Sequence, residues 1–154
     1  MAIARGAGTE IIRSIFLEDT DDQQQELIVG IQHHIYTVLS ITCRCISRSG
    51  SEDGHIKLEG WDSFAGASNQ TIHIADVSCA AGATFVWNDK FSFNGTEPTG
   101  ISGRFGAGDA AADLAYQDAI ADQGSSTRQL LKMYTDSSGT VFDVTCTYID
   151  QNNA

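Results

Sequence analysis

The stretch HIYTVLSITCRCI, residues 34–46, decides the fold class of this chain. Its side chains follow a period of two, which is the period of a β-strand with one buried face. The expected core face carries Ile35, Thr37, Leu39, Ile41, Cys43 and Cys45. The opposite face then carries His34, Tyr36, Val38, Ser40, Thr42 and Arg44.

Short segments of the same character fill most of the remaining sequence. They predict strands at Glu10–Leu17, Glu26–Ile31, His55–Trp61, Gln70–Cys79, Ala83–Trp87, Phe91–Phe93, Gln129–Tyr134 and Thr140–Ile149. In the third of these, Ile56 and Leu58 are expected to point inward and His55, Lys57 and Glu59 outward. Turn residues separate the strands, with a tight turn predicted at Asn88-Asp89 and a hairpin at Asp136–Gly139. About eight strands without a βαβ rhythm indicate an all-β fold: a two-sheet antiparallel sandwich that is jelly-roll-like.

One segment departs from this pattern. Residues 109–123 (DAAADLAYQDAIADQ) have helical composition, with Asp109 as the N-cap and Gly124 as the stop signal. We therefore expect one short helix on an edge or end of the sheets. The expected organisation is an extended arm over residues 1–9, followed by a single β-sandwich domain over residues 10–154.

Charge limits the partners. Twenty acidic residues against nine basic ones give a net charge of −11. Nucleic acids and anionic membrane surfaces both recruit proteins through positive charge, so we expect neither as a partner. The amino end has no continuous apolar segment of the kind that a secretory signal contains, and we expect synthesis in a cytoplasm.

The four cysteines are expected to be reduced. Cys43 and Cys45 share a strand face, where their Cβ atoms would be about 6.5–7 Å apart, whereas a disulfide needs about 3.5–4.5 Å. Cys79 and Cys146 stand alone, and no pair has the spacing of a zinc site.

Candidate catalytic and metal-binding patterns are weak. Residues 106–111 (GAGDAA) match a dinucleotide fingerprint, but their flanks are loops and antiparallel strands. His33, His34, His55 and His73 could suggest a metal site, although adjacent residues on a strand point to opposite faces. A carboxylate pair for glycoside hydrolysis stays open, because twenty acids always offer some suitable pair. The expectation is a non-enzyme with no cofactor and no metal.

Aromatic residues gather in the central third of the chain, where most should belong to the core. Trp61 and Trp87 lie at strand ends beside polar turns. A tryptophan in such a place can anchor a protein or sugar contact, so both are candidate partner-binding residues.

Four segments resemble small virion proteins of tailed bacteriophages: QHHIYTVLSI (32–41), TFVWNDKFSFNG (84–95), QDAIADQGSS (117–126) and TYIDQNNA (147–154). Among these the chain is most similar to capsid decoration, or cement, proteins. The resemblance implies a non-enzymatic protein on the outer surface of the phage head that bridges capsid subunits. Its implied partners are the major capsid protein and further copies of itself, with a trimer as one form.

The amino-terminal arm is the second candidate for partner binding. Met1, Ala2, Ile3 and Arg5 belong to a segment of small, flexible residues that adds little to the domain core. We expect these residues to contact a partner in the assembly. Two alternatives stay open: a phage tail or head–tail adaptor component, and a carbohydrate- or receptor-binding β-sandwich module.

Overall fold

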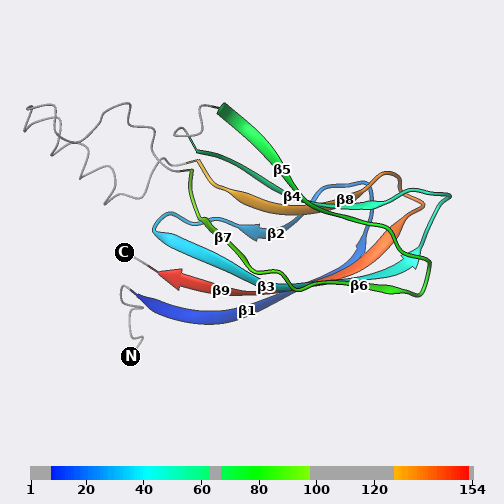
Figure 1. Cartoon of the computed structure of the whole chain (residues 1–154), viewed down its shortest axis with the longest axis horizontal. Coiled ribbons are helices and arrows are strands. Elements are labelled where there is room, and N and C mark those ends of the chain that lie inside the picture. The colour runs from blue at the N-terminus through cyan, green and yellow to red at the C-terminus, as the bar shows by residue number, and fades with distance from the viewer. Residues whose placement is uncertain (1–7, 63–66, 98–126, 153–154) are drawn as a thin grey trace, which may run out of the picture.

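Nine strands stack as two antiparallel sheets in the described part of the protein (Figure 1). The computed structural model describes residues 8–62, 67–97 and 127–152. The strands are β1 (Thr9–Thr20), β2 (Gln25–Val29), β3 (His34–Ser47), β4 (Gly54–Asp62), β5 (Ala67–Val77), β6 (Thr84–Trp87), β7 (Phe91–Asn94), β8 (Leu130–Thr135) and β9 (Val141–Asn152). The all-β sandwich expected from the sequence is confirmed. The helix predicted over 109–123 lies outside the described residues.

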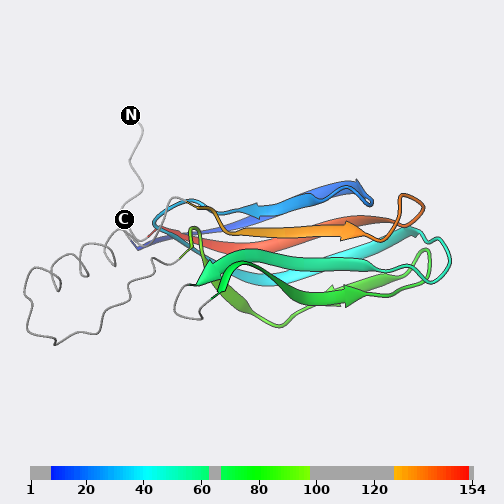
Figure 2. The same cartoon turned by 90° about the horizontal axis from the view of Figure 1, so that it is seen from above.

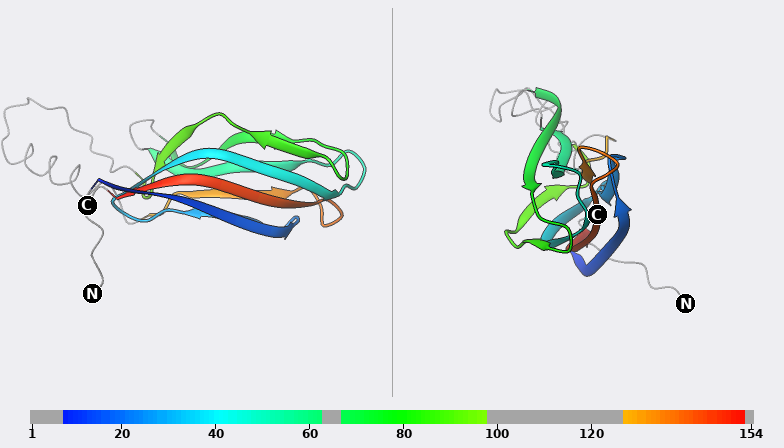
Figure 3. Two further views of the ribbon diagram at one scale, coloured as in Figure 1. Left: turned by 90° about the horizontal axis from the view of Figure 1, so that it is seen from below. Right: turned by 90° about the vertical axis from the view of Figure 1, so that its right-hand side faces the viewer.

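The strand pairing is nested: the first strand pairs with the last, the second with the one before the last, and so on toward the middle of the chain. β1 pairs with β9, β2 with β8, β3 with both β6 and β7, and β4 with β5, all antiparallel. The first sheet therefore runs β1-β9-β3-β6, with β7 also on β3 (Figure 3, left), and the second runs β2-β8-β4-β5 (Figure 2). The chain crosses from one sheet to the other at most of its links, with β4 and β5 as a hairpin within the second sheet, so the expected jelly-roll-like topology is confirmed.

The core fills the space between the two inner faces. Both sheets contribute fully buried aliphatic, aromatic and sulfur-containing side chains, including Val38, Ile41, Ile56, Val77, Leu131, Met133, Phe142 and Val144. Ile56 is buried and Leu58 nearly so, as the alternation in β4 predicts. All four cysteines are free thiols, and Cys43, Cys45 and Cys146 are buried among these core residues.

The predicted core face of β3 is right for one half of the strand and wrong for the other. Ile41, Cys43 and Cys45 point inward as predicted, whereas the amino-terminal half buries Tyr36 and Val38 instead. The pairing with β9 explains the change: Val38 pairs with Tyr148 and Ser40 with Thr147, so Leu39 is an extra residue. A β-bulge of this kind reverses the alternation, which the sequence does not reveal.

Two predicted turns have other roles in the structure. β6 and β7 both pair with β3, at Ile41↔Trp87 and Val38↔Phe91, so residues 88–90 interrupt one strand path rather than forming a hairpin. The segment Asp136–Gly139 links β8 in the second sheet to β9 in the first, so it joins two layers. Turn chemistry predicted that the chain reverses there, but not which strand it meets afterwards.

Two glycines allow three backbone segments to lie in close contact near the ends of β2 and β7. The Gly30 N–H donates to the Gln129 carbonyl oxygen (2.9 Å), and the Gln129 N–H donates to the Gly95 carbonyl oxygen (3.0 Å). A Cβ atom on Gly95 would lie 1.8 Å from the Ile31 carbonyl oxygen, and one on Gly30 would lie 1.9 Å from the Gly95 carbonyl oxygen. Only glycine fits at either position.

Candidate functional site

The outer face of the second sheet carries a group of ionisable side chains that contact one another. Alternation along β4 sends His55, Lys57 and Glu59 outward, as predicted. A hollow of about 210 Å³ lies on this face and is lined by Gln24, Lys57, Glu59, Thr71, His73, Lys132 and Tyr134. Within it the charged groups pair with one another: Lys132 Nζ lies 2.6 Å from Glu59 Oε2, and Lys57 Nζ lies 4.4 Å from the centre of the Tyr134 ring.

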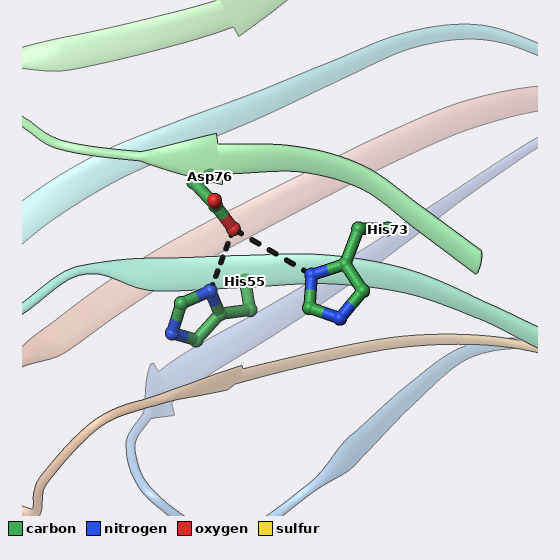
Figure 4. A group of neighbouring side chains, drawn as sticks. All are labelled: His55, His73 and Asp76. Carbon is green, nitrogen blue, oxygen red and sulfur yellow. Dashed lines mark hydrogen bonds and ion pairs between the residues drawn. The ribbon is translucent and has the colours of Figure 1, made fainter. Parts of the chain in front are cut away.

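His55 lies at the centre of a group of acidic residues beside this hollow. Its Nδ1 is 2.7 Å from Asp76 Oδ1 and its Nε2 is 2.8 Å from Asp136 Oδ1, so both ring nitrogens face a carboxylate. His73 Nδ1 lies 4.0 Å from the same Asp76 oxygen (Figure 4). The His55 side chain is only 17% exposed, whereas those of His73 and Asp76 are more than half exposed. We call His55, His73, Asp76 and Asp136 the histidine–carboxylate cluster.

The electrostatics of this cluster favour a charged imidazolium. Burial lowers the pKa of His55, but hydrogen bonds to Asp76 and Asp136 outweigh it, and the net shift in pKa is upward. The hydrogen bond to His55 lowers the pKa of Asp76. The Asp53 N–H and then His55 lower the pKa of Asp136. A histidine with both nitrogens bonded to carboxylates is a double donor, so His55 carries a proton on each nitrogen.

A bulge in β5 brings His73 and Asp76 to the same face. In a regular strand, residues three apart point to opposite faces. Here Ile56 pairs with Ala75 and Lys57 with His73, so Ile74 is an extra residue. After this shift His73 lies opposite Lys57 and Asp76 lies opposite His55, and both face outward. The sequence singled out His55 and His73 but missed their carboxylate partners, because nothing local marks the bulge.

A second ion-pair group lies on the inner face of the first sheet. Asp150 on β9 is almost fully buried, with 4% of its side chain exposed. It accepts from Arg13 Nε of β1 at 2.9 Å and lies 2.6 Å from His34 Nδ1 of β3. These contacts tie the three strands together across the sheet. His34 therefore belongs to this group on the first sheet, whereas His55 and His73 lie on the second sheet.

The outer strand β1 exposes large apolar side chains. β1 bonds to β9 on one side, and no described strand bonds to its other side. Ile12 is 70% exposed and Phe16 is 55% exposed. Ile12 pairs with Ile149 and Phe16 pairs with Thr145. The next residues along β9, Asp150 and Cys146, are buried and point inward, so Ile12 and Phe16 lie on the outer face of the first sheet.

The predicted partner-binding residues fall into three groups. Met1, Ala2, Ile3 and Arg5 lie outside the described residues. Trp61 lies in β4, near its carboxyl end. Trp87 ends β6, packs against the core, and donates its indole N–H to the Asp89 carbonyl oxygen at 2.7 Å. The Trp87 side chain therefore contributes to the fold.

Comparisons with known proteins give similarities at low identity. No protein-family model matches the sequence, and no curated protein matches it either. A chain from Bacillus endospore appendages, described as a novel family of disulfide-linked pili, is 10% identical with a TM-score of 0.44, and the match covers 100% of this chain and 97% of that one. A chain of the T13 particle of infectious bursal disease virus is 8% identical with a TM-score of 0.41, covering 99% of this chain. A chain of the Gx strain of that virus is 11% identical with a TM-score of 0.36 and the same coverage of this chain.

This chain spans less than two fifths of the length of those viral chains, 37% and 39% respectively. None of the described residues forms a helix with the length and apolar character that a bilayer crossing requires.

Proposed function

We propose that this chain is a structural protein of a bacteriophage virion, a capsid decoration protein that acts by non-covalent contacts on the outside of the head. The observation that carries this proposal is the open edge of β1, with Ile12 and Phe16 exposed on it. Monomeric proteins usually protect a long edge strand with charges, bulges or covering segments. The ladder of β1 is regular from Thr9 to Leu17, before the bulge that precedes Thr20, and two large apolar side chains exposed on this regular part are typical of a surface that another molecule covers.

The occupant that we propose for this edge is a second copy of the chain. Antiparallel pairing of two β1 strands about a two-fold axis at Ser14 places Ile12 of each copy opposite Phe16 of the other. Such an interface is self-complementary, since the same patch serves on both copies. Cross-strand aromatic–aliphatic pairs each contribute roughly 0.2–1 kcal/mol, in addition to the new backbone hydrogen bonds.

The same proposal assigns no catalytic role. The imidazole of His55 is bonded to two carboxylates, the carboxylate of Asp150 is bonded to Arg13 and His34, and these contacts hold strands together. A general base needs a free lone pair directed at a substrate. The virion proposal also draws on the resemblance of the four sequence segments to phage virion proteins, and it places the protein on the outer surface of the head.

The test is a charge introduced at the edge. We expect Ile12→Lys with Phe16→Lys to abolish self-association in analytical ultracentrifugation, because two lysines replace the apolar contact. Val86→Lys is the matched control: Val86 is 49% exposed on β6, the opposite outer strand of the same sheet. Circular dichroism should give both variants a thermal midpoint close to that of the wild type.

A second measurement addresses the capsid itself. Purified protein is mixed with heads of the encoding phage that were assembled without it, and the mixture is sedimented. We expect the wild type and Val86→Lys to co-sediment with the heads in stoichiometric amounts. If the wild type does not bind heads, the decoration role is wrong. If the edge variant still self-associates, the proposed β1 contact is wrong.

A further inference from the structure

We propose that His55, His73 and Asp76 form a binding site for a divalent transition-metal ion of the zinc class, with Asp136 orienting His55. Each residue offers one donor atom, an imidazole nitrogen of His55 and of His73 and a carboxylate oxygen of Asp76, and these three atoms lie within 4.8 Å of one another. Two imidazoles and one carboxylate form a donor set that suits zinc. The three side chains come from two adjacent strands and converge on one point (Figure 4).

The distances need only a small adjustment. Metal–ligand bonds of about 2.0–2.2 Å in a tetrahedron put neighbouring donor atoms about 3.4 Å apart. Asp76 Oδ1 lies 2.7 Å from His55 Nδ1 and 4.0 Å from His73 Nδ1, so the required spacing falls between the two. His73 and Asp76 are the exposed members and can rotate, while His55 is fixed. The exposed side leaves a path for entry and a fourth position for water.

Asp136 supplies the support that protein metal sites usually have. A histidine that binds a metal through one nitrogen commonly donates its other N–H to a carboxylate, which fixes the ring and its tautomer. His55 Nε2 lies 2.8 Å from Asp136 Oδ1, on the opposite side of the ring from Asp76 and His73. This contact orients the Nδ1 lone pair toward the other two donors.

The bulge at Ile74 is the second observation. Without it, His73 and Asp76 would face opposite sides of the sheet, and no three-donor group would exist. Bulges are enriched beside functional sites, where they redirect side chains. Among the described residues, this is the one group of three or more histidine, cysteine and acidic side chains with donor atoms this close together.

Binding exchanges a proton for the metal ion. His55 is a double donor without metal, so the Nδ1 proton must leave before Nδ1 can coordinate: one ion binds and one proton is released. The charged and titratable groups around this nitrogen are Asp76 and His73 on β5, Lys57 on β4, Tyr134 on β8 and Asp136 after β8. Lys57 opposes a cation and the two carboxylates favour it, which leaves a net attraction.

The experiment titrates the full chain with Co²⁺ and then with Zn²⁺, using visible absorption and calorimetry. We expect one ion per chain, a spectrum typical of nitrogen and oxygen ligands, and displacement of Co²⁺ by Zn²⁺. His73→Gln should weaken binding at least tenfold and leave the thermal midpoint unchanged, because this exposed ring does not hold the fold. Asp76→Asn should weaken binding similarly.

The matched control is His34→Gln, which removes the histidine that contacts Asp150 on the first sheet. This variant should bind metal with the affinity of the wild type. Binding of Co²⁺ by His73→Gln with wild-type affinity would overturn the proposal. A thiolate-to-cobalt charge-transfer band would also overturn it, because such a band would show that cysteines bind the ion. The absence of saturable binding would overturn it as well. None of these results depends on the β1 contact, so the virion proposal and the metal site are tested separately.

Discussion

His55 joins three parts of the chain through a single side chain. It lies on β4 and contacts Asp76 on β5 and Asp136 in the link between the two sheets. A charged hydrogen bond at such a junction opposes local opening of the outer strand β5. Because both carboxylates are about half exposed, solvent screening limits the gain to on the order of 1 kcal/mol.

The contribution of His55 to stability should depend on pH in a definite direction. Its pKa is raised in the folded state, so its contribution is complete below the unfolded pKa and is lost as pH rises through the folded pKa. The pKa values of Asp76 and Asp136 are lowered, so their contribution is present above the unfolded carboxyl pKa and is lost as pH falls. The cluster is therefore most stabilising between these limits, near pH 5–6.

We expect His55→Gln to lower the free energy of unfolding by on the order of 1 kcal/mol at about pH 5.5, and by clearly less at about pH 9. Urea unfolding of the variant and the wild type at both pH values, without metal, measures the difference. His73→Gln serves as the control and should change little at either pH. An equal loss for His55→Gln at both pH values would mean that the ring acts by packing rather than by charge.

At the scale of the element, the strands were predictable and the bulges were not. Alternation in β4 gave the correct faces for Ile56, Leu58 and His55 because that strand keeps its register against β8. In β3 and β5, one extra residue, Leu39 or Ile74, shifts the phase, and each shift decides which side chains meet. A bulge depends on the partner strand, so a single sequence carries no local signal for it. For this reason His73 could be named from the sequence, whereas its position beside Asp76 could not.

The close approach at Gly95 gives a prediction at this scale. Gly95→Ala places a methyl group against the backbone of Ile31, which cannot move without breaking the hydrogen bonds around Gly30 and Gln129. We expect a loss of about 3 kcal/mol or more in the free energy of unfolding, measured with urea.

Gly54→Ala is the matched control for that substitution. Its added Cβ would lie 3.0 Å from Met133 Cε and 3.1 Å from Phe142 Cε2, and the thioether end of Met133 can shift. The loss for Gly54→Ala should be the smaller of the two. If Gly95→Ala proved as stable as the wild type, the close approach of Gly95 to the backbone of Ile31 would be wrong.

At the scale of the molecule, the nested pairing accounts for the misplaced turns. In this jelly roll, most links between consecutive strands cross from one sheet to the other, and β4–β5 is the pair of consecutive strands that bond to each other, so local turn signals do not predict which strands pair. The link at residues 136–139 carries good turn residues but connects two layers. Strand number, short links and the lack of a helical rhythm were enough to predict the architecture. The pairing itself depends on contacts between distant residues.

The net charge of the molecule affects how strongly two copies associate. At −11 each, two copies repel, and the proposed β1 contact has to overcome that repulsion with apolar and backbone contacts. The Debye length is about 30 Å at 0.01 M salt and about 8 Å at 0.15 M, so added salt removes most of the repulsion.

We therefore expect the dissociation constant for self-association to fall as salt rises from about 0.01 to 0.15 M. Sedimentation velocity at fixed protein concentration measures this change. Val86→Lys should follow the same trend, because its charge is far from the contact, and Ile12→Lys with Phe16→Lys should stay monomeric throughout. Weaker association at higher salt would mean that ion pairs, rather than the apolar edge, hold the copies together, and the assignment of Ile12 and Phe16 to the interface would be wrong.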